Sequence, residues 1–285
     1  MYCEVKPKAK YKADLHCHTT ASDGILTPAE IVRLADERGL RALAITDHDT
    51  IEGWVEAEKF ASQVGLRLIK GLEINTDWKG KEIHILGYGP GKEKGSLERF
   101  LEELRRKRVD RIEEILAKLS RLNIHLSLTE VKQYAKGQSI GRPHVVQAMM
   151  AKGYVSTYQE GFEKYLKIGA PAYVPRAKLT PTEAISIIRE AGGVAVLAHP
   201  GNNVSQEEIQ KWIEDGLQGI EISHPDHTPN QKKKYERLAF RNGLLATGGS
   251  DYHGPRVKPG VELGDWGVDL ELVDQLEQLI ISSRL

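Results

Sequence analysis

Histidine and carboxylate side chains recur in this sequence at spacings that suit metal binding. His16 and His18 stand two residues apart near the start of the chain, and Asp251 and His253 repeat that spacing near its end. In a strand, alternate side chains point to the same face, so each pair offers two ligand groups on one side. Cys17 then points the other way, and we expect it in the core. Imidazole and carboxylate groups without thiolates suit Zn²⁺, Mn²⁺ or Fe²⁺ rather than Ca²⁺.

Further candidate ligands lie in or just after other apolar runs of the sequence. They are Asp23, His48, Glu73, His84 and His199, which bring the predicted ligand set to nine residues. Nine ligands exceed what one ion can use, so the set predicts a cluster of two or three divalent ions. Closely spaced ions suit phosphoryl chemistry, because they acidify water, hold the phosphate and neutralise charge on the attacking and leaving oxygens.

The elements that must position these groups alternate along the chain. We expect seven strands, near residues 13–16, 42–46, 67–74, 83–88, 194–198, 219–223 and 244–248. Amphipathic segments separate most of them and predict helices over 28–38, 51–63, 207–215 and 229–241, and from 181 to the glycines at 192–193. The alternation is typical of a parallel sheet. No G-x-G-x-x-G follows the first strand, which favours a barrel, where the carboxyl ends of the strands form one active face.

One stretch, residues 96–169, carries only helical patterns. Its leucines and isoleucines from Leu97 to Leu122 recur every three or four residues and predict one long amphipathic helix, followed by shorter ones at 128–135, 143–152 and 157–167. We therefore expect a barrel domain formed by residues 1–95 and 170–285, with a helical insertion over 96–169. The basic run Arg105–Arg108 is interpreted as a solvated helix face.

Composition excludes several classes of protein. The 40 basic and 40 acidic residues balance, which disfavours a non-specific nucleic-acid clamp. No apolar run approaches the ~20 residues of a membrane span, and the first residues lack the apolar core of a signal peptide. Two cysteines, Cys3 and Cys17, in a chain of 285 residues indicate a reducing compartment, so we predict a cytoplasmic protein. No membrane partner or obligate protein partner is evident.

Taken in order, the motifs of the chain resemble those of the polymerase-and-histidinol-phosphatase (PHP) superfamily. They are D-L-H-C-H-T-T-A-S-D-G, I-T-D-H-D-T, G-L-E-I, the strand of His84, V-L-A-H-P and G-S-D-Y-H-G. The resemblance implies a distorted (β/α)₇ barrel and a trinuclear metal site. It groups the ligands as His16, His18, Glu73 and Asp251 on one ion, as Glu73, His84 and His199 on a second, and as Asp23, His48 and His253 on the third. It also implies a metal-activated hydroxide held by Glu73, Asp251 and His199.

Within that superfamily, the chain resembles stand-alone phosphatases acting on nucleoside 3′,5′-bisphosphates and on the 5′ ends of short RNA. The resemblance rests on the insertion, on Gly141–His144, on Tyr173–Pro175 and on His227–Pro229. It implies that Arg142, His144 and His227 contact the substrate. Pro143 marks a helix N-terminus, which favours anions, and Arg142 can add a bidentate phosphate contact. Alternatively, Arg142 and His144 only cap the helix, and His224 and His227 belong to a surface loop.

The sequence therefore predicts a metal-dependent phosphoesterase with a nucleotide substrate, preferably a nucleoside 3′,5′-bisphosphate and also the 5′ ends of short RNA. A histidinol-phosphate phosphatase is the first alternative, although a small amine substrate has no evident need of the insertion with Arg142. A PHP module that serves a DNA polymerase in trans is the second.

Overall fold

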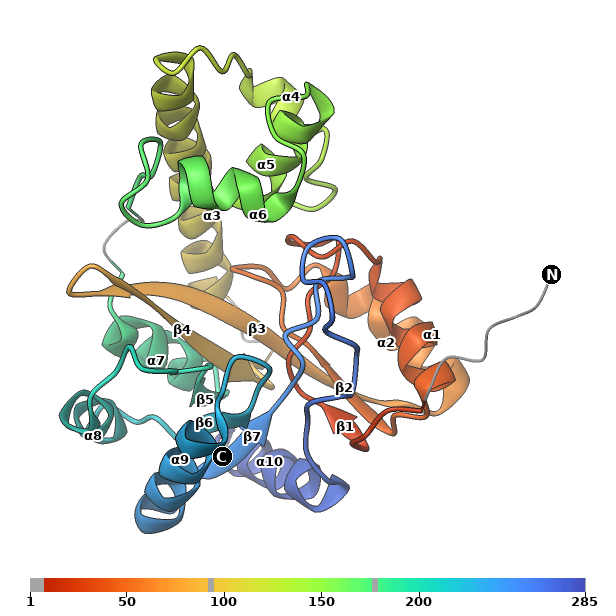
Figure 1. The fold of residues 1–285 in the computed structure, drawn as a ribbon. Helices are drawn as coiled ribbons and strands as arrows, with labels where there is room; N and C mark the ends of the chain where they lie inside the picture. Colours follow the sequence, from red (N-terminus) through yellow and green to blue (C-terminus); the bar gives the residue numbers. More distant parts are fainter. Residues whose placement is uncertain (1–7, 92–94, 176–178, 285) are drawn as a thin grey trace.

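The computed structural model describes residues 8–91, 95–175 and 179–284, and seven strands form its centre (Figure 1). They form one sheet in the order β1-β2-β3-β4-β5-β6-β7. Their bounds are β1 Ala13–Asp14, β2 Ala42–Ile45, β3 Arg67–Trp78, β4 Lys81–Tyr88, β5 Val194–Leu197, β6 Gly219–Ser223 and β7 Leu245–Gly248. All seven expected strands are confirmed, although β1 is shorter and β3 longer than predicted.

The two edges of the sheet approach each other where the chain continues beyond β1 and β7. Leu15 N donates to Gly248 O at 3.2 Å, and Asp251 N donates to His16 O at 2.8 Å. This contact requires a glycine at position 249, because a Cβ there would lie 2.4 Å from the Cβ of His16. The sheet thus curves almost into a closed barrel, and the predicted distorted (β/α)₇ barrel is confirmed.

The expectation of an all-parallel sheet was wrong for β4. This strand pairs antiparallel with both β3 and β5, whereas the other pairs are parallel. The physical reason is the connection: only Lys79 and Gly80 separate β3 from β4, and both have positive φ, as in a tight hairpin. A parallel return would need a crossover of a dozen or more residues.

Six helices surround the sheet. They are α1 Pro28–Arg38, α2 Gly53–Val64, α7 Pro181–Glu190, α8 Gln206–Glu214, α9 Pro229–Asn242 and α10 Leu270–Ser282. The first five match the predicted helices to within two residues, because capping residues, prolines and glycines in the sequence mark most of their ends. Thr27 and Thr180, for example, each form a capping box before a proline in the first turn. Helix α10 was not predicted.

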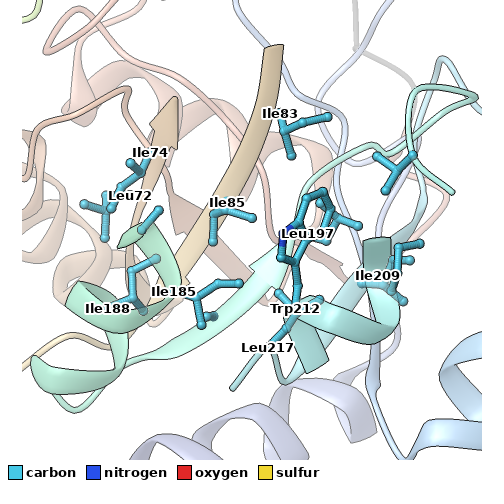
Figure 2. Close-up of a cluster of buried hydrophobic side chains, with 14 of the residues drawn as sticks. Leu72, Ile74, Ile83, Ile85, Ile185, Ile188, Leu197, Ile209, Trp212 and Leu217 are labelled. Atoms are coloured by element: carbon cyan, nitrogen blue, oxygen red, sulfur yellow. The ribbon is translucent and has the colours of Figure 1, made fainter. Parts of the chain in front are cut away.

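The barrel core continues outward between the sheet and its helices. Figure 2 shows Leu72 and Ile85 of the β3–β4 hairpin facing Ile188 of α7, with Trp212 of α8 beyond them. Trp212 is fully buried. Burying such apolar surface contributes roughly 25 cal/mol per Å² and fixes the hairpin against α7 and α8.

The insertion forms a layer of helices above one end of the barrel (Figure 1). It consists of α3 Gly95–Ser120, α4 Leu128–Lys132, α5 Arg142–Ala151, α6 Tyr158–Gly161 and a π-helical turn, η1, Phe162–Leu166. Its buried apolar residues from Ile112 onward form a cluster that reaches to Val174, whereas Leu97, Leu101 and Leu104 at the start of α3 pack into the cluster of the barrel. The prediction for the basic run was wrong at Arg108, which is buried and donates to Asp49 Oδ2 at 2.6 Å.

Two further predictions concern cysteine and the membrane. Cys17 is fully buried, and its thiol donates to Ala44 O at 3.0 Å, so its core position is confirmed. Cys3 lies outside the described residues. Over the part of the chain that the structure describes, no helix has both the length and the apolar character to cross a bilayer.

Candidate metal centre

The nine predicted ligands meet at the end of the barrel that faces the insertion. Six strands or the turns directly after them contribute, because parallel strands end at the same edge of a sheet. His16 and His18 follow β1, His48 follows β2, His199 follows β5, and Asp251 follows β7. His84 reaches the same edge for the opposite reason. Since β4 is antiparallel, its beginning lies there, and His84 pairs with Asn75 late in β3.

The first group of ligand atoms lies around His16 and His18. Their Nε2 atoms are 3.2 Å apart, and both approach Asp251 Oδ1, at 3.4 Å from His16 and 3.1 Å from His18. Glu73 closes the group, with Oε2 at 3.3 Å from His18 Nε2. All four side chains are nearly or fully buried. The predicted grouping of these residues therefore corresponds to a real convergence of atoms.

Glu73 also belongs to the second group. Its Oε1 lies 2.9 Å from His84 Nδ1 and 3.0 Å from His199 Nε2. Its Oε1 also lies 3.5 Å from His16 Nε2, and its Oε2 lies 2.8 Å from His48 Nδ1, so Glu73 contacts imidazoles of all three predicted groups.

The third group lies beside the first. Asp23 faces His253 Nε2 at 3.4 Å and His48 Nε2 at 3.8 Å, and His18 Nδ1 lies 3.7 Å from the same carboxylate. One ligand atom from each of these four residues lies within 4.8 Å of the others. The structure thus brings together all nine predicted residues.

Several buried atoms indicate that these groups fit cations. His18 Nδ1 and Asp251 Oδ1 are buried and have no hydrogen-bond partner among the described residues. Buried polar atoms without a partner are rare and call for an ion or a water molecule. The donors are nitrogen and oxygen only, which suits divalent transition metals.

The pKa values show that the buried carboxylates and imidazoles of this centre interact strongly. Burial alone would lower the pKa of His18, but the Asp251 and Glu73 carboxylates raise it to about 10. Burial lowers the pKa of His48 to about 4. The carboxyl of Glu73 is held well below its usual pKa by the surrounding histidines, although burial opposes this. The buried carboxylates of this centre are thus stabilised by nearby positive charge, which protons on the histidines or divalent cations can supply.

The backbone is strained at the same place. Asp49, His199 and Asp251 have positive φ angles of 51°, 23° and 50°. Non-glycine residues adopt this region at an energetic cost, and such residues cluster at functional sites. Two of the three strained residues, His199 and Asp251, are predicted ligands.

Sequence reasoning missed one buried carboxylate, Glu221 of β6. Its Oε1 lies 3.1 Å from His16 Nδ1, on the side of the ring away from the cluster, and its Oε2 accepts from His199 N at 2.8 Å. It is fully buried, and its pKa falls to about 2 because charges of His16 and His224 outweigh burial. The signal was present in the sequence: Glu221 is a charged residue inside the apolar run Gly219–Ser223.

The three residues predicted to contact substrate lie in different surroundings. Arg142 begins α5 and lines a cavity of about 120 Å³ next to Asp23, His48 and His84. His144 is buried, and its Nδ1 accepts from Gly141 N at 3.0 Å, as the capping alternative describes.

His227 has both ring nitrogens engaged with backbone, Nδ1 donating to Ile222 O at 2.9 Å and Nε2 accepting from Gly201 N at 3.2 Å. The structure therefore gives His227 a role in fixing loops. His224, which the alternative interpretation places in a surface loop, is instead buried, with Nε2 at 3.5 Å from Asp251 Oδ2.

The opposite wall of the cavity belongs to the insertion. Arg108 and Arg111 of α3 line it together with Arg142. Arg142 donates to Glu82 Oε2 at 2.7 Å, and Arg111 donates to Val174 O at 2.8 Å. Arg108 Nη2 is buried without a hydrogen-bond partner among the described residues. Three guanidinium groups therefore face a cluster of metal-ligand type across one small space.

Comparison with known proteins agrees with this geometry. The PHP domain model matches residues 14–172. A 5′-3′ exoribonuclease of Haemophilus influenzae is 37% identical over 270 residues, covering 93% of this chain and 96% of the relative. A 3′,5′-nucleoside bisphosphate phosphatase of Chromobacterium violaceum is 34% identical over 248 residues, covering 85% and 87%.

A solved structure from Bifidobacterium adolescentis, classed as a metal-dependent phosphoesterase, superimposes with a TM-score of 0.90 at 32% identity and covers 96% of this chain and 98% of its own. The motifs, the barrel, the converging ligands and these relatives agree, and the chain belongs to the PHP domain family of metal-dependent phosphoesterases.

Proposed function

We propose that this phosphoesterase removes phosphate from nucleoside 3′,5′-bisphosphates and hydrolyses the 5′ ends of short RNA. One observation carries the proposal: a single cavity has one carboxylate and two imidazoles of metal-ligand type, those of Asp23, His48 and His84, on its barrel side and three arginines on its insertion side. Two anion-binding walls suit a substrate with two phosphates. One phosphate would lie at the metal cluster, where the ester bond breaks, and the other at the arginines.

The cluster would hold two or three divalent ions, of Mn²⁺, Zn²⁺ or Fe²⁺. We assign one ion to His16, His18, Glu73 and Asp251, a second to Glu73, His84 and His199, and a third to Asp23, His48 and His253. When bound, such ions supply an activated water and neutralise charge on the phosphate oxygens. The contribution of the chain is to hold these ligands rigidly, since nearly all of them are buried and lie in or beside strands.

The arginines would hold the phosphate that is not cleaved. Arg108 Nη2 is a buried donor without a partner among the described residues, and a phosphate oxygen would satisfy it. Arg142 shares its guanidinium with Glu82, but a guanidinium has five N–H donors and can serve a carboxylate and a phosphate together. The N-terminus of α5, at Gly141, also lines the cavity and favours an anion.

The nucleoside would extend out of this cavity. A volume of about 120 Å³ is well below the roughly 300–1,000 Å³ of typical ligand pockets, so it suits phosphates rather than a whole nucleotide. A larger, mostly apolar cavity of about 560 Å³ lies next to it, and Phe162 lines both. Tyr158 and Lys258 line the larger cavity too, and Lys258 donates to Asp251 Oδ2 at 2.8 Å. The base would therefore lie between the insertion and the loop after β7.

The primary test compares three substrates under one metal condition. Phosphate release from adenosine 3′,5′-bisphosphate, and mononucleotide release from a 5′-phosphorylated oligoribonucleotide, should both be faster than phosphate release from histidinol phosphate. Preference for histidinol phosphate would replace the proposal with the first alternative. No hydrolysis of any of the three with Mn²⁺, Zn²⁺ or Fe²⁺ supplied would contradict the proposed substrate class.

Arg142→Ala gives a sharper test of the second phosphate. If Arg142 holds the uncleaved phosphate, its contact is equal in the ground and transition states, and its loss raises KM more than it lowers kcat. Losing a charge-assisted contact of about 1.5–3 kcal/mol reduces kcat/KM for the bisphosphate about 10- to 150-fold. A substrate with only the scissile phosphate should be nearly unaffected. Equal losses for both substrates would assign Arg142 to the reacting phosphate or to the fold through Glu82.

A further inference from the structure

A groove on the flank of the barrel, between α8 and α9, has a strongly basic lining. Its volume is about 460 Å³, and Lys233, Lys234, Arg237 and Arg241 line it with neutral residues but without any Asp or Glu. Lys234 lies over the Tyr235 ring at 4.9 Å. The other three cations form no ion pair with any residue in the described ranges. Against these four cations α9 carries one carboxylate, Glu236, which does not line the groove, so the groove itself has a local positive field although the whole chain is neutral.

The groove begins near the metal centre. Gln206 and Asn230, which lie in the first turns of α8 and α9, line its upper end, and both helices start at the mouth of the barrel. Tyr235 donates to Gly201 O at 2.6 Å, two residues after the candidate ligand His199. Because α9 has 14 residues, its axis runs about 21 Å away from that mouth. The groove thus leads from the mouth down the outside of the barrel.

An exposed aromatic side chain lies beside these cations. Phe240 is 89% exposed, the most exposed of the large apolar side chains that the structure describes. It follows Lys233 by seven residues and Arg237 by three, so the helical period places all three on one side of α9. Cations that follow a phosphate backbone, with aromatic rings for stacked bases, are the combination that single-stranded nucleic acids require.

We propose that the α8–α9 groove binds the sugar–phosphate backbone of single-stranded RNA, downstream of a 5′-terminal nucleotide in the metal centre. This inference rests on the proposed function, because it adds a path for the rest of an oligonucleotide substrate. The four cations would contact successive phosphates, and Phe240 would stack on a base. A mononucleotide would not reach the groove, so the groove would distinguish RNA from nucleoside bisphosphates.

The test uses a triple variant, Lys233→Gln with Arg237→Gln and Arg241→Gln. Its matched control, Lys12→Gln with Arg41→Gln and Lys59→Gln, removes three exposed cations that lie before β1, before β2 and on α2. The groove variant should lose on the order of 10- to 100-fold in kcat/KM for a 5′-phosphorylated octaribonucleotide at 0.1 M salt, because three phosphate contacts are lost. Each lost contact should also reduce the slope of log affinity against log salt concentration by about 0.7. Its kcat/KM for adenosine 3′,5′-bisphosphate should stay within about twofold of wild type, and the control should match wild type on both substrates.

Phe240→Ser provides an independent variant. Loss of one stacked base should weaken octaribonucleotide use by about 5- to 150-fold without changing the salt slope. Wild-type values for both groove variants with the octaribonucleotide, or equal losses with both substrates, would overturn the proposal.

Binding distinguishes failure of the groove from failure of the proposed function. Fluorescence anisotropy of a labelled octaribonucleotide, measured with EDTA-treated protein, needs no catalysis. If the wild type hydrolyses neither substrate, the proposed function fails. The groove proposal would still be supported if the triple variant binds RNA more weakly than both the wild type and the control variant. Equal RNA binding by the triple variant, its control and wild type would overturn it. The proposal is also overturned if poly-glutamate displaces the labelled RNA as effectively as unlabelled RNA does, because the groove would then bind acidic chains in general.

Discussion

At the scale of single residues, Glu221 contacts two candidate ligands in different ways. It accepts from the His199 backbone N–H at 2.8 Å, where φ is 23°, and it lies 3.1 Å from His16 Nδ1. A carboxylate on the far nitrogen of a ligating imidazole fixes its tautomer and orientation and makes it a better ligand. We therefore infer that Glu221 is a positioning residue, which would act on bound metals through His16 and His199.

From this arrangement we expect Glu221→Gln to weaken metal binding by about 10- to 100-fold, the effect usual for such outer partners. The amide keeps an acceptor for the His199 N–H but loses the negative charge beside His16. Titration of metal-free protein with Mn²⁺ or Zn²⁺, followed by elemental analysis, measures the affinity directly. Circular dichroism of the metal-free variant checks that the fold is intact. A variant that binds metal with wild-type affinity would remove Glu221 from this role.

At the scale of elements, the insertion is joined to the barrel mouth by a buried ion pair. Arg108 of α3 donates to Asp49, which follows β2, at 2.6 Å, and both side chains are less than a tenth exposed. Arg108 also donates to Ile140 O at 3.2 Å, so one side chain connects the barrel to the helices of the insertion. We propose that residues 96–169 are a separate cap domain, because the buried apolar residues from Ile112 onward form a cluster distinct from those of the barrel, while Leu97, Leu101 and Leu104 at the start of α3 join the insertion to the barrel cluster.

A double-mutant cycle tests the energetics of this junction. Arg108→Met should lower the free energy of unfolding by about 3–5 kcal/mol, because it leaves the Asp49 charge buried without its partner. The double variant Arg108→Met, Asp49→Asn should be more stable than that single variant, because it removes both charges, and asparagine tolerates the positive φ of position 49. Denaturant unfolding of the four proteins gives the coupling energy. Additive effects of the two changes would show that the pair is not coupled.

At the scale of the whole molecule, the metal centre lies where the barrel nearly closes. Leu15 and Asp251 donate across the two edges of the sheet, and the candidate ligands His16, His18 and Asp251 lie within this junction. Four carboxylates, Asp23, Glu73, Glu221 and Asp251, gather there, and their side chains are largely or fully buried. Divalent ions that bind only the folded chain would neutralise them and hold the two edges together.

Metal removal should therefore destabilise the whole protein as well as abolish activity. At metal concentrations about 100-fold above Kd, binding adds about 2.7 kcal/mol to the free energy of unfolding. For a chain of 285 residues that corresponds to a fall in Tm of roughly 4–5 °C on chelation for each ion lost. Differential scanning fluorimetry with EDTA, and then with Mn²⁺ restored, measures the shift. A Tm that does not change with metal would mean that the ligands bind no ion at these concentrations.

The sequence by itself determined the ligand types, most helix ends and the seven strands, because these depend on local chemistry. His16, His18 and Glu73 could be singled out because charged or polar residues interrupt apolar runs, and the capping boxes mark helix starts wherever they occur. The short connection at Lys79 and Gly80 also required β4 to be antiparallel, although the side-chain pattern of a buried strand does not show its direction. Only the tertiary structure decided the burial of Arg108 and the role of Glu221. Both depend on which segments pack together, because a charged side chain is solvated or buried according to what lies opposite it.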